Sequence, residues 1–147
     1  MYKNLKALII NLVHILWCVC VCVCVCVQAE ILQHQVVICT CHTAGILLTR
    51  GLLRGDFSHI IFDEASQAME PEVMLGLRFA DENTHVVLAG DPKQLGASVR
   101  SPLAAKRGLG ISLQERLMKQ EPYLSDNSIY ITKLVFNYRS HGSIIEV

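Results

Sequence analysis

The chain of 147 residues is long enough for one domain with a buried core. Its formal net charge is zero, which excludes an overall basic field for nucleic acid but not a local RNA-binding groove. Seven cysteines do not indicate a disulfide framework, because most of them alternate with valine over positions 18–26. Neighbouring cysteines on one strand face do not have disulfide geometry.

Residues 1–30 differ from the rest of the sequence. Ala7 to Val27 form an apolar run of about the length that spans a bilayer, so a signal peptide or membrane anchor is one interpretation. The Cys-Val repeat is also what a TG dinucleotide repeat encodes, so translated non-coding DNA is a second interpretation. A buried strand is a third. We therefore leave residues 1–30 out of the fold prediction, as a hydrophobic segment that does not look native.

Beyond residue 30, four short apolar runs predict the strands of a sheet. They are rich in β-branched residues and lie at 35–40, 59–62, 85–89 and 128–132, the last continued by Leu134 and Val135. Nearly continuous apolar runs are typical of strands that are covered on both faces in a parallel sheet.

Helical patterns lie between these runs. Pro71 opens one helix. The inner face of that helix is predicted to carry Val73, Met74, Leu77 and Ala80. Ser101-Pro102 predicts an N-cap followed by proline, and Ser112 to Glu115 matches a capping box. Strands that alternate with helices predict an α/β, doubly wound parallel sheet, in which ligands bind at the carboxyl ends of the strands.

A pair of adjacent acids follows the second apolar run. Asp63 and Glu64 stand at the carboxyl end of a hydrophobic strand, which is the Walker B arrangement. Asp63 can hold Mg²⁺, because Mg²⁺ takes one or two carboxylates beside phosphate oxygens. Glu64 can orient an attacking water and accept its proton. The alternative is a helix N-terminus that Asp63 caps and Glu64 stabilises through the helix dipole.

Two further motifs carry candidate chemistry. The third run breaks into a Gly90-Asp91-Pro92 turn that presents Gln94, whose amide can contact a γ-phosphate and the attacking water. The alternative is a plain turn, for which this sequence is suitable. Arg139 follows the last predicted strand and can stabilise transition-state charge, as arginine fingers do. The alternative is a solvated basic residue.

Taken in order, these motifs resemble motifs II, III and IV of superfamily 1 helicases of the Upf-like branch. The matching stretches are Asp63–Gln67, Gly90–Gly96 and Asn137–His141. A narrower likeness is to the Moloney-leukaemia-virus-ten and Armitage RNA helicases. It is carried by Arg100–Leu103, Gly108–Gly110, Ser112–Leu117 and Ile131–Leu134. The likeness runs from about Gln35 to the last residue.

The resemblance implies two RecA-like lobes of the P-loop NTPase type, here incomplete. Residues 31–130 would be the C-terminal part of the first lobe, and residues 131–147 the start of the second. ATP and Mg²⁺ are the implied cofactors, and the implied partner is RNA, single-stranded or duplex with a 5′ overhang. The resemblance also implies 5′-to-3′ unwinding and RNA silencing, with silencing-complex proteins as partners, in the cytoplasm and its RNA granules.

The same resemblance assigns roles by position in the motifs. The implied catalytic residues are Glu64, Gln94 and Arg139. The implied cofactor-binding residues are Asp63, which holds Mg²⁺, and Asp91, Gln67 and Tyr138. Thr40 and Arg100 are the candidates for contact with RNA, with a structural strand end as the alternative for Thr40. Cys39-Thr40-Cys41-His42 does not have the spacing of a closed zinc site, so zinc is not expected.

One motif of this class is missing from the sequence. No glycine is followed by lysine, so the chain holds no loop to cradle the phosphates. We therefore expect a fragment of an ATP-dependent RNA helicase with weak or no catalysis of its own. The alternatives are a non-catalytic interaction or regulatory fragment of that family and, if residues 7–27 are a genuine anchor, a membrane or secreted protein.

Overall fold

The computed structural model of the chain describes residues 6–11, 28–125, 127–136, 138, 140 and 141. The chain divides into two compact units, Met1–Arg116 and Leu117–Val147. The domain boundary predicted after residue 130 lies within the second of these units and stays a prediction.

The first unit is built on a parallel sheet of four strands. These are β1 (Ala7–Asn11), β2 (Val36–Cys39), β3 (His59–Asp63) and β4 (His85–Leu88). Their order across the sheet is β2-β1-β3-β4, and each strand is parallel to its neighbours. The α/β class and the parallel sheet predicted from the sequence are confirmed.

β1 comes from the segment left out of the fold prediction, yet it joins the two halves of the sheet. Ile10 stands in register with Cys39 of β2 on one side and with Phe62 of β3 on the other. Leu8 and Ile10 are fully buried. Apolar and β-branched residues suit a strand that is paired along both edges. Of the three interpretations of residues 1–30, the buried strand is therefore the one that fits Ala7–Asn11.

Ala7–Asn11, the first part of the apolar run over residues 7–27, is a strand of the sheet. Residues 12–27, which include the Cys-Val repeat, lie outside the described residues. In the part of the chain that is described, no helix has the length and hydrophobicity to cross a membrane.

Helices cover part of the sheet, and several of them begin at side-chain caps. They are α2 (Gln28–Ile31), α3 (Cys41–Thr49), α4 (Glu70–Leu77), α5 (Pro102–Lys106) and α6 (Leu113–Met118), with a short 3-10 helix, η1 (Ala65–Gln67). The Ser101 hydroxyl accepts a hydrogen bond from the Ala104 N–H at 3.3 Å, and that of Ser112 accepts one from the Glu115 N–H at 3.1 Å. Both predicted N-caps are thus confirmed.

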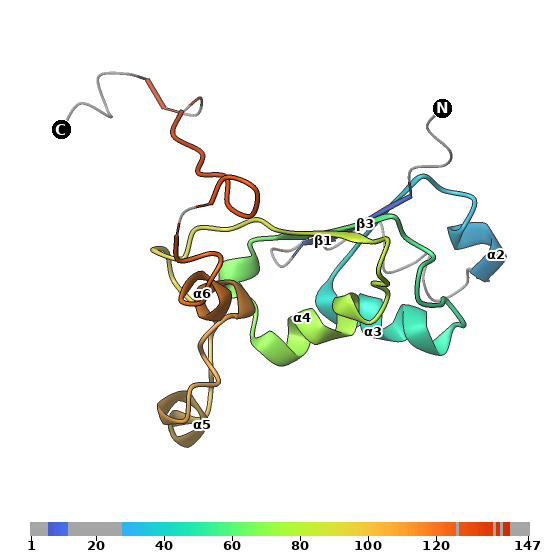
Figure 1. Cartoon of the computed structure of the whole chain (residues 1–147). Helices are drawn as coiled ribbons and strands as arrows, with labels where there is room; N and C mark the ends of the chain where they lie inside the picture. Colours follow the sequence, from blue (N-terminus) through green and yellow to red (C-terminus); the bar gives the residue numbers. More distant parts are fainter. Residues whose placement is uncertain (1–5, 12–27, 126, 137, 139, 142–147) are drawn as a thin grey trace. The chain divides into compact units, whose positions relative to one another are not determined.

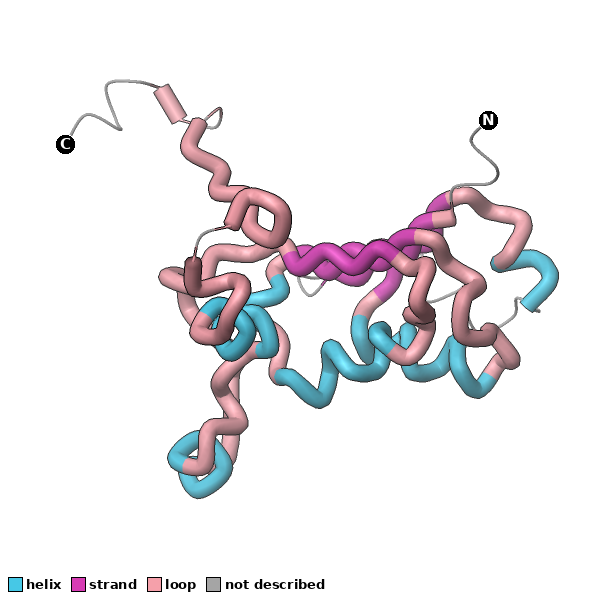
Figure 2. Tube along the Cα trace, viewed as in Figure 1, coloured by secondary structure: helices cyan, strands magenta, loops and turns pink. Residues whose placement is uncertain are grey.

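Helices α3 and α4 pack side by side against one face of the sheet (Figures 1 and 2). The core between the layers contains Leu8, Ile10, Leu47, Ile60, Phe62, Val73 and Phe79. Gly76 lets α4 approach closely, because a Cβ atom added there would lie 2.8 Å from Phe62 Cζ and even closer to Ile10 Cδ1. The predicted inner face of α4 is partly wrong: Val73 is buried, but Met74 is 41% exposed.

The opposite face of the sheet is partly open within the described residues. Ile38, Ile9, Ile61 and Val87 form one row across the four strands on this face. Ile38 and Val87, on the edge strands, are 38% and 46% exposed. Coverage on both faces was predicted from the continuous apolar runs; Ile9 and Ile61, on the central strands, are half-buried on this face.

The second unit contains no strand among its described residues, so the strand predicted at 128–132 is also wrong. Backbone N–H groups of Tyr130 and Ile131 instead donate to the Asn127 carbonyl, at 2.9 and 3.0 Å, and form a turn. Leu134 and Val135 are 93% and 78% exposed. An isolated strand has neither a hydrogen-bonded neighbour nor a surface to bury against, so a β-prone sequence alone does not form one.

We predict that Gly76→Ala destabilises the first unit by about 1–3 kcal/mol, because the added methyl group overpacks the contact between α4 and the sheet. Gly45→Ala in α3 is the matched control, since its Cβ would meet Leu75 at an ordinary 3.4 Å. Urea unfolding followed by circular dichroism measures both. Equal midpoints for the two variants would contradict the close approach of α4.

We predict that Ile10→Ala costs about 2–5 kcal/mol of unfolding free energy, because it opens a cavity beneath a central strand. Ile9→Ala, on the open face of the same strand, is the control and costs less. The same urea titration applies. If neither variant changes stability, β1 is not part of the folded sheet.

Candidate active site

The acidic turn, defined here as Asp63–Gln67, begins at the last residue of β3. Glu64 has φ 55° and ψ 38°, the left-handed conformation that residues other than glycine rarely adopt. Such a conformation costs on the order of 1–3 kcal/mol and often marks a functional position. It turns the chain sharply from β3 into η1, so that both acids stand at the carboxyl edge of the sheet.

The two acids of this turn have different hydrogen bonds. The Asp63 Oδ1 atom accepts from the Glu64 N–H at 3.1 Å, and the Glu64 Oε2 atom accepts from the Gln67 side-chain amide at 3.1 Å. Both carboxylates are half-buried. Gln67, predicted as a cofactor-binding residue, is thus placed where it orients Glu64.

The donor set at this turn fits Mg²⁺ only in part. In the described residues, no three or more acidic, histidine or cysteine side chains gather into a metal cluster. Mg²⁺ commonly takes one or two carboxylates from the protein and its other ligands from water and phosphate. Asp63 fits that role, provided that a phosphate is present.

The amide turn, defined here as Gly90–Gln94, follows β4. The strand ladder continues past both strands, with the Ala89 N–H donating to the Phe62 carbonyl and the Ala65 N–H donating to the Ala89 carbonyl, each at 2.8 Å. The two turns therefore leave adjacent strands at the same edge of the sheet. This placement of the acid pair beside the Gly-Asp-Pro turn is what the sequence predicted.

Within the amide turn, the polar groups bind one another. The Asp91 carboxylate accepts from the Lys93 N–H at 2.9 Å and from the Gln94 side-chain amide at 3.3 Å. The Gln94 N–H also donates to the Asp91 carbonyl, at 3.1 Å. Asp and Asn side chains commonly stabilise turns by accepting a hydrogen bond from the backbone N–H two residues later. The side-chain amide of Gln94 has a second N–H and a carbonyl oxygen, so it can contact another group as well as Asp91.

Gly90 fits into a narrow space between the two turns and α6. A Cβ atom added at this position would lie 2.9 Å from the Ser66 nitrogen and 2.7 Å from the Gln114 Oε1 atom. The Gln114 side-chain amide donates to the Gly90 carbonyl at 3.0 Å. A residue with a side chain would push the two turns apart, so glycine is required here.

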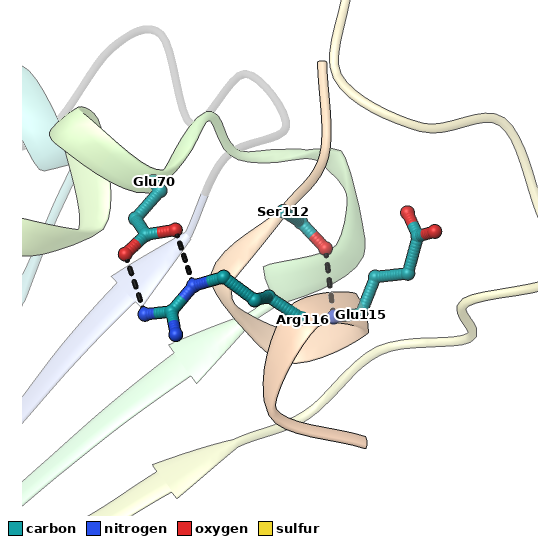
Figure 3. Close-up of polar contacts among 4 residues, drawn as sticks. All are labelled: Glu70, Ser112, Glu115 and Arg116. Carbon is teal, nitrogen blue, oxygen red and sulfur yellow. Dashed lines mark hydrogen bonds and ion pairs between the residues drawn. The ribbon is translucent and has the colours of Figure 1, made fainter. Parts of the chain in front are cut away.

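Three residues around the site were not identified from the sequence: Gln114, Arg116 and Glu70. Figure 3 shows Arg116 of α6 facing Glu70 of α4, with two hydrogen bonds of 2.8 and 2.7 Å. These bonds lower the pKa of the Glu70 carboxyl below its ordinary value. Ser112, at the start of the same helix, caps it in the same view. Only the fold brings these groups together, so no local pattern reveals them.

The remaining predicted site residues are Thr40, Arg100, Tyr138 and Arg139. The Thr40 hydroxyl accepts from the Thr43 N–H at 3.2 Å and caps α3, which is the structural alternative named for it. Arg100 is exposed in a loop. Tyr138, in the second unit, is 93% exposed. Arg139 lies outside the described residues. The roles of Tyr138 and Arg139 therefore stay predictions.

The two cysteines beside Thr40 are buried and not disulfide-bonded. Burial raises the pKa of the Cys39 thiol to about 12 and that of the Cys41 thiol to about 11. Both thiols are therefore protonated near neutral pH, whereas the thiolate is the form that binds metals and attacks electrophiles.

Comparison with known proteins identifies the family of this chain. A family model described as "AAA domain" (AAA_11) matches residues 25–102. The Danio rerio protein mov-10-B.1, which is named a helicase, is 50% identical over 129 residues, covering 82% of this chain and 12% of that protein. The mouse (Mus musculus) RNA helicase Mov10l1 is 43% identical over 122 residues, covering 76% of this chain and 10% of that protein.

A third relative, armi of Drosophila melanogaster, is named a probable RNA helicase and is 40% identical over 125 residues, covering 78% of this chain and 10% of that protein. The chain thus spans about a tenth of the length of the relatives it matches. The resemblance drawn from the motifs is confirmed. The chain belongs to the AAA domain family and, within it, is similar to the RNA helicases of the Mov10 and Armitage type.

Proposed function

We propose that this chain carries the hydrolysis residues of an ATP-dependent RNA helicase, in motifs II, III and IV and without a phosphate loop. One observation supports this above all others. The acidic turn and the amide turn leave adjacent parallel strands at one edge, joined by the hydrogen bond from Ala65 to Ala89. A carboxylate pair and a side-chain amide can then act on the same phosphate.

The geometry of the acidic turn supports a division of labour. Asp63 would hold Mg²⁺, which offsets the charge of the ATP phosphates when bound. Glu64 accepts the proton of the attacking water, and the hydrogen bond from Gln67 fixes the direction of its carboxylate. The strained backbone at Glu64 is consistent with a residue held in place for chemistry.

In the amide turn, Gln94 exchanges its hydrogen bond to Asp91 for one to the γ-phosphate, so that the turn reports whether the phosphate is present. Asp91 and Tyr138 are proposed nucleotide contacts. Arg139, which lies outside the described residues, is proposed to stabilise the charge that develops on the transferred phosphoryl group.

The proposed substrate is RNA, because the relatives Mov10l1 and armi are named RNA helicases. Arg100 is the proposed contact to the RNA backbone. For Thr40 the observed cap supports the structural role, and its contact with RNA stays a prediction. From the same family likeness we propose 5′-to-3′ unwinding of RNA with a 5′ overhang, silencing-complex partners, and a cytoplasmic setting in RNA granules.

A second function is favoured by one observation, the lack of any Gly-Lys pair in the 147 residues. Without a lysine and backbone amides to hold the triphosphate, the chain would serve as a non-catalytic interaction or regulatory unit of the same family. The two functions differ in whether the chain itself turns over nucleotide.

We predict that the 147-residue chain shows no RNA-stimulated ATP hydrolysis, because nothing in its sequence replaces the phosphate loop. Phosphate release is measured with and without single-stranded RNA, and Glu64→Gln sets the background. Turnover in the natural chain that Glu64→Gln abolishes would show that the chain is a complete catalyst.

We predict a specific order of effects in a polypeptide that joins a phosphate-loop segment in front of Gln35. The added segment must also supply the central strand that Ala7–Asn11 provides here. Glu64→Gln then lowers turnover by about 10² to 10⁴ and preserves ATP affinity, because it removes the base alone. Asp63→Ala instead weakens Mg-ATP binding.

In the same polypeptide, Arg139→Ala lowers turnover more than affinity. The matched control is Glu82→Gln, which makes the Glu64 change at an exposed acid before β4 and leaves both quantities unchanged. Steady-state hydrolysis and nucleotide titration give the two readouts. Equal losses of affinity in the Glu64 and Asp63 variants, with no effect at Arg139, would mean that these roles are misassigned.

A further inference from the structure

Helix α6 contacts both sides of the candidate active site through two side chains that have no assigned role. Gln114 donates to the Gly90 carbonyl, at the start of the amide turn. Arg116, two residues later, binds Glu70, the first residue of α4, which follows the acidic turn. We propose that Gln114 and Arg116 are positioning residues that make α6 a brace, holding the amide turn at a fixed distance from the acidic turn.

The contact between Arg116 and Glu70 fixes the relative orientation of the two side chains as well as attracting them. Nε donates to Oε2 at 2.8 Å and Nη2 donates to Oε1 at 2.7 Å, so both planar groups meet edge to edge. A pair of this kind fixes the angle of one helix against the other, which a lysine cannot do. Exposed ion pairs usually add little stability, and both side chains here are partly exposed. Orientation is therefore the better explanation for this pair.

The contact from Gln114 carries a cost that packing alone would not require. Its Oε1 atom is buried and has no hydrogen-bond partner among the described residues, while its Nε2 atom donates to Gly90. Reversing the amide would lose the bond to Gly90, because a carbonyl cannot accept from an oxygen that carries no proton. An apolar side chain of the same volume would avoid the unpaired oxygen. The bond to Gly90 is what explains a glutamine here.

The brace matters because the hydrogen bonds from the sheet to this segment end at Ala89, just before the amide turn. The hydrogen bonds of Asp91 and Gln94 stay within the turn, and the side chains from Gly90 to Leu95 are exposed. The Gly90 carbonyl is where α6 holds the turn against the unit. The purpose of the brace rests on the proposed function, since a γ-phosphate sensor has to stay within reach of the acids. The contacts of Gln114 and Arg116 themselves do not depend on that function.

The test is the backbone order parameter, S², of the Gly90, Asp91 and Lys93 amides, measured by ¹⁵N relaxation on the full chain without nucleotide or RNA. We expect values near 0.85 in the natural chain and below about 0.6 in Gln114→Met, which keeps the volume and loses the hydrogen bond. Arg116→Ala should give the same loss. The matched control is Arg107→Ala, an exposed arginine at the end of α5, which should leave S² unchanged.

A charge exchange separates positioning from general stability. Glu70→Arg combined with Arg116→Glu restores the pair in reverse and should return the turn amides toward natural values. The proposal is overturned if S² of the turn does not change in Gln114→Met and Arg116→Ala, or if it falls equally in β1 and β3. If Arg116→Ala does not fold, Arg116→Lys replaces it, with the same two outcomes. Because no nucleotide is used, the S² measurement tests the brace independently of whether the hydrolysis proposal holds.

Discussion

Parallel pairing of β3 with β4 is the constraint on which the candidate site depends. His59 to Phe62 stand in register with His85 to Leu88, and the ladder runs on to Ala89 and Ala65. Because the strands are parallel, the chain leaves both at the same edge, where the acid pair and the amide turn meet. A slip by one residue would exchange the two faces of β3 and turn Phe62 out of the core.

The sheet in turn depends on β1, which lies between β2 and β3. A central strand must provide backbone hydrogen bonds on both edges and apolar side chains toward the helices, and Leu8 and Ile10 do so. Many different sequences meet these requirements, since they ask only for a short run of apolar residues. That is why a segment next to a low-complexity repeat serves as a core strand.

The site itself departs from ordinary local preferences. Glu64 is left-handed without being glycine, and a methyl group added at Gly90 would clash with the backbone of the acidic turn. The Ser66 hydroxyl and the Gln114 carbonyl oxygen are buried without hydrogen-bond partners among the described residues. Such costs concentrated on two turns are typical of functional positions, where the rest of the fold offsets local strain.

Much of this could be predicted from sequence, because the signals are local. The strand runs, the caps at Ser101 and Ser112, and the acids at the end of β3 each follow from residues adjacent in the chain. The strand predicted at 128–132 was wrong because a strand also needs a neighbour. Gln114, Arg116 and Glu70 were missed, and Ala7–Asn11 was set aside, because pairing over long sequence distances decides what they contact. The sequence by itself determined which chemical groups stand at the strand ends; the tertiary structure decided which of them meet, because hydrogen bonding and burial between distant segments have no local signature.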